Sequence, residues 1–228
     1  PYGNHVVFRS ALGFSDLHVK LGGELPGLDL AGYWFKALLT DEVLPVCVGK
    51  LTYVEEKEKL PIEVVTLTPT LNYPNLAVVF EQSDWTEQES LLDHYHFSLY
   101  TLLAGLLNPS DAKPNNHIWV PLFNEDGNLR YRLVDVDNEQ NFQAAVVEQD
   151  RKIKVEAKSI FYCFDFLHRP LHPRVAELFM HIQPYSFLQR WLKLLVGVDE
   201  GLQELFKNHI QYLLDKPDNK KTTIPILL

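Results

Sequence analysis

Leucine and aromatic residues recur at helical spacing between residues 91 and 106, and this pattern constrains the fold more than any other in the sequence. An apolar face with three- and four-residue intervals indicates an amphipathic helix. Thr86 and Glu89 form a capping-box pattern before it, and Asn108-Pro109 is a signal that ends it. The residues expected on the apolar face are Leu91, Leu92, Tyr95, Leu99, Leu102, Leu103 and Leu106.

Short β-rich segments dominate the chain before this helix. Strands are predicted at residues 5–10, 16–21, 45–51, 62–67 and 76–81, the first two joined by a turn at Leu12-Gly13-Phe14. A helix is expected from Pro26 to Leu39, because apolar residues recur at helical spacing after a proline. The charged run at 55–59 is expected to be a solvated loop.

After the central helix the pattern changes to one hairpin, one strand pair and helices. The hairpin is predicted at 117–123 and 129–136, around Asn124-Glu-Asp-Gly127. Further strands are expected at 144–148 and 153–155, and helices at 174–181, 185–195 and 200–214. The sequence therefore predicts an α+β chain with a β-rich N-lobe at 1–83 and a mainly helical C-lobe at 84–228.

Composition narrows the range of partners. The net charge of −9 argues against nucleic acid, because phosphate binding requires clustered lysine and arginine. No apolar stretch is long enough to cross a bilayer, so no transmembrane segment is expected, although membrane association and delivery into a host cell stay open. Cys47 and Cys163 stand in apolar runs and are expected to be buried, which favours a reducing, cytoplasmic compartment. The chain begins at Pro1, so we expect a part of a longer protein whose other domains are its partners.

The segment after the central helix holds residues suited to catalysis. Asp111 can accept a proton or orient a hydroxyl group, and Lys113 can neutralise charge on a phosphoryl group. Asn116 offers a neutral oxygen ligand to a hard cation. The same residues also suit an ordinary helix-to-strand turn, because aspartate, proline and asparagine are common in turns.

Two further places carry charged residues of interest. Asp135 and Asp137 stand at the end of an apolar strand, where alternation places both side chains on one side, so a cation between them and Asn116 is plausible. Lys20 lies within an apolar strand, either on a solvated edge or beside a buried anion. Asp29, on the helix that follows, is a candidate partner for Lys20.

These elements follow the order that ATP-dependent phosphoryl transfer requires. The segments 29–33 (DLAGY), 43–45 (VLP), 111–116 and 136–142 (VDNEQNF) resemble the atypical kinases of the phosphatidylinositol 3/4-kinase superfamily. The type II phosphatidylinositol 4-kinases and the toxin-type bacterial Ser/Thr kinases have the most similar patterns. The resemblance extends from about residue 6 to residue 142 and does not include the helical tail.

The resemblance implies a two-lobed protein-kinase-like fold that uses ATP and Mg²⁺. It implies that Lys20 binds the ATP phosphates with Asp29 as its partner. Asp111 would be the catalytic base and Lys113 a phosphate contact. Asn116 and Asp137 would be the Mg²⁺ ligands, with Asp135 as the alternative to Asp137. The implied substrate is a hydroxyl group of a protein or of an inositol lipid (a phosphoinositide).

Three departures from the family pattern leave other functions open. Glu139 stands where these families have glycine, Asp29 replaces the longer glutamate, and no complete glycine-rich loop precedes Lys20. They motivate a catalytically impaired pseudokinase or interaction module with the same fold. A third hypothesis is an α+β binding domain in which the polar turns are only structural.

Overall fold

The structure is a computed structural model that describes residues 5–8, 16–21, 26–51, 54–55, 58–59, 63–82, 84–137, 140–149, 152–155 and 157–215. Helices and strands are both present, so the predicted α+β class is confirmed. The chain forms two compact units, each of which has its own elements. Unit 1 contains the residues up to Thr70 and those from Tyr185 onward, and unit 2 is Leu71–Pro184. The boundary predicted near residue 84 falls inside unit 2.

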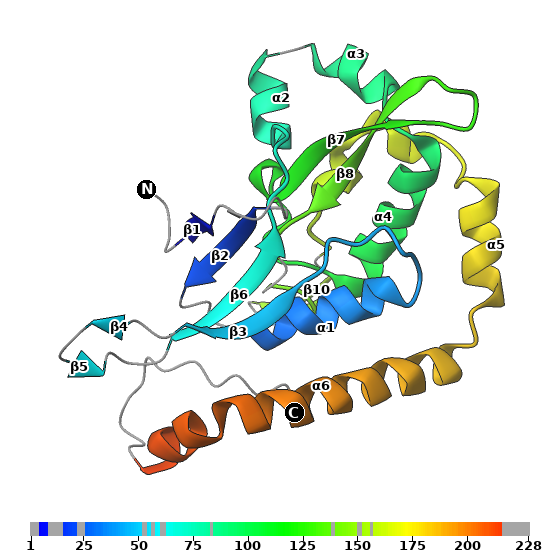
Figure 1. Ribbon diagram of the computed structural model, residues 1–228. Helices are drawn as coiled ribbons and strands as arrows, with labels where there is room; N and C mark the ends of the chain where they lie inside the picture. The colour runs from blue at the N-terminus through cyan, green and yellow to red at the C-terminus, as the bar shows by residue number, and fades with distance from the viewer. Residues whose placement is uncertain are drawn as a thin grey trace. The chain divides into compact units, whose positions relative to one another are not determined.

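A four-stranded antiparallel sheet organises unit 1 (Figure 1). Its order is β1 (His5–Phe8), β2 (Leu17–Leu21), β6 (Glu63–Pro69) and β3 (Cys47–Leu51). The β-branched residues of β6 suit this inner position, and Val64, Val65 and Thr66 are all buried. The strands predicted at 5–10, 16–21, 45–51 and 62–67 are thus confirmed, with small shifts of their ends.

Two helices lie in the described part of unit 1. α1 (Pro26–Ala37) was predicted, and it packs on β3 and β6. α6 (Pro184–Asp215) packs along α1: Trp191 Nε1 donates to the carbonyl oxygen of Ala31 at 3.0 Å, and the ring of Phe35 contacts the rings of Phe187 and Trp191 edge-on. One cluster of core residues in this unit consists of Leu30, Val46, Val64, Leu202 and Phe206.

The prediction of two separate helices at 185–195 and 200–214 was wrong, because α6 is continuous. The glycine at 197 costs a helix only about 1 kcal/mol relative to alanine. Buried Leu195 and Leu202 on either side of it lie on one face and keep the helix against its unit. Tertiary packing therefore outweighs the low helix propensity of Gly197. The helical tail belongs to the same unit as the N-terminal sheet.

Three other expectations for unit 1 have different outcomes. The loop predicted at 55–59 contains a small antiparallel pair, β4 (Val54–Glu55) and β5 (Glu58–Lys59). Cys47 is exposed rather than buried, as is Cys163 in unit 2. The turn predicted at 12–14 lies outside the described residues.

In unit 2, the segment predicted as a strand at 76–81 is the helix α2 (Leu76–Gln82). Asn75 begins it, since its side-chain oxygen accepts a hydrogen bond from the amide of Val78 at 3.0 Å. Only Leu76 and Val79 are buried, at a helical spacing of three. The valines of this segment favour a strand, but the Asn75 cap begins a helix that contains them. The apolar pattern used for the prediction did not include this cap.

The predicted central helix is two helices, α3 (Trp85–Ser90) and α4 (His94–Leu107). Each begins with its own aspartate cap: Asp84 accepts from the amide of Thr86, and Asp93 from the amide of His96. The chain leaves the helix between them because residues 91 and 93 hydrogen-bond to Tyr131. The capping box was therefore wrong, and Leu92 is buried before α4 begins, whereas Leu106 is exposed.

The rest of unit 2 follows the sequence more closely. The predicted hairpin is confirmed as β7 (His117–Phe123) and β8 (Leu129–Asp135), and the predicted strand pair as β9 (Val146–Gln149) and β10 (Lys152–Val155). Short 3-10 helices follow at η2 (Ile160–Cys163) and η3 (Asp165–His168), and then α5 (Pro173–His181). None of the helices in the described part of the chain has the length and apolarity that a bilayer crossing needs.

Candidate functional site

The loop between α4 and β7 is closed by Asn116. Pro114 begins a single 3-10 turn, η1 (Pro114–Asn116), which places Asn116 at the start of the hairpin. Its side-chain Nδ2 donates to the main-chain oxygen of Asp111 at 2.7 Å and lies 3.4 Å from the carboxylate Oδ2. The side-chain amide of Asn116 is buried, and its nitrogen is directed toward Asp111. The amide oxygen is therefore directed away from Asp111.

Lys113 pairs with Asp111 within the same loop. Its Nζ lies 2.8 Å from Asp111 Oδ2, and both side chains are about half exposed. An exposed pair of this kind contributes about 0–1 kcal/mol to stability, because water screens the charges. Lys113 can therefore leave Asp111 for another anion at little cost in free energy.

Asp135 and Asp137 lie beside this loop. β8 ends at Asp135, and the next amide, of Val136, donates to the main-chain oxygen of Asn116 at 2.9 Å. Asp137 has a left-handed backbone, with φ of 66°. Strand alternation, on which the sequence prediction relied, therefore does not extend to Asp137. Asp135 and Asp137 nevertheless both line one pocket.

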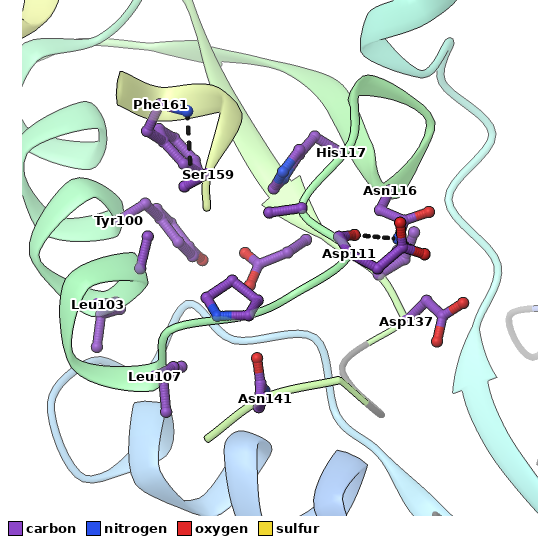
Figure 2. A pocket seen from close by; sticks show the side chains of 15 residues that line it. Tyr100, Leu103, Leu107, Asp111, Asn116, His117, Asp137, Asn141, Ser159 and Phe161 are labelled. Atoms are coloured by element: carbon purple, nitrogen blue, oxygen red, sulfur yellow. Dashed lines mark hydrogen bonds between the residues drawn. The ribbon is translucent and has the colours of Figure 1, made fainter. Parts of the chain in front are cut away.

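Figure 2 shows this pocket, to which Asp111, Asn116 and Asp137 contribute side chains. Its volume is about 30 Å³, room for a cation with a water ligand, since about 10–15 Å³ holds one water. The apolar part comes mainly from α4 and η2. The lining residues are Tyr100, Leu103, Ala104, Leu107, Pro109, Asp111, Ala112, Asn116, His117, Asp135, Val136, Asp137, Asn141, Ser159 and Phe161.

Several residues of this pocket were missed from the sequence. Tyr100 and Asn141 are buried, at 3% and 2% exposure, and both face the pocket in Figure 2. Asn141 stands within the segment that carried the family resemblance, and this could have identified it. Tyr100 had no such signal, because an aromatic residue on a helix is most simply a core residue.

The donor set fits a hard cation. The carboxylates of Asp135 and Asp137 and the amide oxygen of Asn116 are the oxygen ligands that Mg²⁺ and Ca²⁺ prefer. Among the described residues, no three or more His, Cys, Asp and Glu side chains gather as a group that could hold a metal ion. A cation at this loop would therefore need Asn116 and water as ligands beside the carboxylates.

Lys20 and Asp29 lie in unit 1. Lys20 is on β2, opposite His5 of β1 and Thr66 of β6. Asp29 is in the first turn of α1 and is only 3% exposed. The loop with Asp111 belongs to unit 2, and the roles of Lys20 and Asp29 at the ATP phosphates stay predictions. Glu139 and the glycines upstream of Lys20 lie outside the described residues.

A second polar cluster joins the N-terminal ends of α4 and α5. His96 Nδ1 lies 2.6 Å from Asp93 Oδ1, and His94 Nε2 donates to the carbonyl oxygen of Pro170 at 2.8 Å. The rings of His94 and His172 are 5.2 Å apart. Burial tends to raise the pKa of Asp93, but hydrogen bonds from His96 outweigh it and leave this pKa below its usual value. The cluster fastens α5 to α4 and does not reach the pocket.

His172 makes stability depend on pH. Burial, and then the neighbouring His94, lower the pKa of His172 from its ordinary value of 6.5. The unfolded chain therefore binds a proton at a higher pH than the folded chain does, so stability falls as pH decreases through 6.5. We expect thermal denaturation between about pH 7 and pH 5 to show a smaller loss of stability for His172→Gln than for wild type. The exposed His168→Gln is the control, and equal slopes for H172Q and wild type would contradict this assignment.

Comparison of the sequence with models of known protein families finds no family that matches, and comparison with curated proteins finds no match either. A function for the pocket is therefore inferred from its residues and their geometry.

Proposed function

We propose that the protein is a Mg²⁺- and ATP-dependent phosphotransferase of the atypical kinase type, which phosphorylates a hydroxyl group of a protein or of an inositol lipid. The observation that supports this most is that Asp111, Asn116, Asp135 and Asp137 line one pocket. They come from two segments of the chain, joined by the hydrogen bond from Val136 to Asn116. Kinase chemistry requires a base and metal ligands in such an arrangement.

Asp111 is the residue suited to act on the hydroxyl acceptor. Its carboxylate is about half exposed, so an acceptor can reach it from solvent. The hydrogen bond from Asn116 to the main-chain oxygen holds the backbone of Asp111 in place. Asp111 would orient the hydroxyl group and accept its proton as the phosphoryl group is transferred.

Asn116, Asp135 and Asp137 are the residues that would hold Mg²⁺. The bound metal would neutralise charge on the phosphates and align them for transfer. The cavity has the size of an ion with a water ligand rather than of a nucleotide, so the base and ribose would lie outside it.

Lys113 would bind a phosphate oxygen. Its pairing with Asp111 at 2.8 Å keeps it beside the proposed base before substrate binds. Because this pair is solvent-exposed, exchanging Asp111 for a phosphate group costs little. The exchange would also release the Asp111 carboxylate for the acceptor.

Thermal denaturation with and without Mg-ATP tests the proposal. Binding stabilises a protein by about 2.7 kcal/mol at a ligand concentration of about 100 times Kd, so the Tm of the wild type should rise by several degrees. Asp137→Asn should remove most of the rise, because asparagine tolerates the left-handed backbone but lacks the charge. Asp126→Asn, in the exposed turn of the hairpin, is the matched control.

Each outcome has a definite meaning. A wild type whose Tm is unchanged by Mg-ATP would overturn the proposal. Stabilisation without any measurable transfer would favour the impaired kinase, which keeps nucleotide binding and has lost the reaction.

A further inference from the structure

The end of α4 pairs with the segment that follows Asp137. The amide of Phe142 donates to the oxygen of Leu107 at 2.5 Å, that of Gln143 to Asn108 at 3.3 Å, and that of Ser110 to Gln140 at 2.9 Å. These hydrogen bonds join two segments, 107–110 and 140–143. We call this pairing the α4 clasp.

Side chains reinforce the clasp at both ends. Asn108 Nδ2 donates to the main-chain oxygen of Gln143 at 2.9 Å, and Ser110 Oγ lies 3.0 Å from Gln140 Oε1. Asn108 is buried at 9% exposure, whereas the contact between Ser110 and Gln140 is exposed. The side-chain hydrogen bond of Asn108 is therefore partly buried, whereas that of Ser110 is exposed.

The backbone at the clasp is unusual. Asn108 and Phe142 both have left-handed conformations, with φ of 40° and 61°. Asparagine tolerates this region, but a bulky residue such as phenylalanine adopts it only when the surrounding structure holds it there. The hydrogen bonds on both sides of Phe142 provide that restraint.

The clasp lies close in sequence to both segments that line the pocket. Ser110 immediately precedes Asp111, and Gln140 lies three residues after Asp137. On the other side of the pocket, Asp135 pairs with His117, and Val136 donates to Asn116. The two segments that carry the site are thus joined both at the hairpin and at the clasp.

We propose that Asn108 is a positioning residue for the candidate metal ligands. It caps α4 in a conformation that allows the clasp to form, and its amide fastens the segment after Asp137 to the segment before Asp111. Without this hydrogen bond, Asp137 would sample positions too far from Asn116 for both to bind one cation. This role rests on the proposed function, since it concerns the same metal.

Asn108→Gly tests this role because glycine keeps the left-handed backbone and removes only the amide. Asn124→Gly is the matched control: Asn124 Oδ1 accepts a hydrogen bond from the amide of Asn128 at 2.8 Å in the hairpin turn, away from the pocket. Mn²⁺ serves as the probe, by calorimetric titration or paramagnetic resonance. We expect N108G to weaken Mn²⁺ binding by about 10- to 100-fold, as loss of an outer-shell hydrogen bond commonly does, and N124G to leave it unchanged.

Hydrogen–deuterium exchange provides a second readout that does not depend on the metal. Peptides covering 135–143 should exchange faster in N108G than in wild type, and at the wild-type rate in N124G. Unchanged exchange in these peptides, or Mn²⁺ affinity equal to wild type, would overturn the positioning role. If the wild type itself binds no Mn²⁺, the proposed function fails, while the exchange rates still decide whether Asn108 positions the segment. Asn108→Asp, which also tolerates the left-handed backbone and lacks the donor, replaces N108G if the glycine variant does not fold.

Discussion

Replacing Asp111 with alanine is expected to lower kcat for phosphoryl transfer by about 10²- to 10⁴-fold, the usual contribution of a positioned general base. The KM for ATP should change little, because the acceptor hydroxyl rather than the nucleotide is the proposed partner of this carboxylate. Release of ADP and transfer of labelled phosphate measure the effect. A D111A enzyme with the wild-type rate would exclude Asp111 as the base.

The Asp111→Ala variant should remain folded, which makes its kinetic result interpretable. Asn116 donates its 2.7 Å hydrogen bond to the main-chain oxygen of Asp111, and this oxygen is unchanged in the variant. Of the side-chain contacts that are lost, the pair with Lys113 is exposed and contributes little, and the one from Asn116 Nδ2 is long at 3.4 Å. Asp126→Ala, another exposed aspartate, controls for the loss of one negative charge.

Replacing Phe206 with alanine is expected to destabilise unit 1 by about 3–5 kcal/mol, because truncating a buried aromatic residue leaves a cavity. Phe206 is only 1% exposed and packs in the core with Leu30, Val46 and Val64. Scanning calorimetry or urea denaturation measures the loss.

Leu205→Ala is the control for this prediction. Leu205 is the preceding residue of α6 and is 45% exposed, so its truncation should cost far less. Similar losses for both variants would contradict the packing of α6 into the core of unit 1. The pair also distinguishes a helix that is part of the unit from one that only follows it in the chain.

Local signals predicted most of the strands because each of them depends on neighbouring residues. The β7–β8 hairpin follows from apolar runs on either side of Asn124-Glu-Asp-Gly127, and α1 follows from apolar spacing after Pro26. The prediction failed at 76–81, where a strand-like run of valines forms α2. There Asn75 supplies a helix cap, and only Leu76 and Val79 enter the core. Short apolar runs allow both structures, and the cap and burial decide between them.

The boundaries of α3 and α4 could not be predicted from local signals either, because they depend on a residue far along the chain. Asp93 caps α4, but residue 131, far along the chain, pairs with residues 91 and 93 and interrupts the helix. The helical spacing of apolar residues in this segment cannot predict a contact with residue 131. The continuity of α6 is a further case, since burial of Leu195 and Leu202 outweighs Gly197.

The candidate site was predictable in its residue types and only partly in its geometry. Asp111, Asn116, Asp135 and Asp137 were identified from spacing, and they line one pocket. The reason given for Asp137 was strand alternation, whereas its left-handed backbone follows the end of β8. Asn108 was recognised only as part of a helix stop, because its hydrogen bond to Gln143 joins residues 35 positions apart.

The sequence by itself determined the α+β class, the hairpin and the chemical groups available at the loop, because side-chain identity and local periodicity fix these. Tertiary structure decided which of those groups meet. Asp137 reaches the pocket of Asp111 through the β7–β8 pairing and the α4 clasp, and α6 belongs to unit 1 through burial of Leu202 and Phe206. Such contacts form between residues far apart in the chain, so no local sequence pattern predicts them. The free energy of burying apolar surface and satisfying backbone hydrogen bonds selects them only in the folded chain.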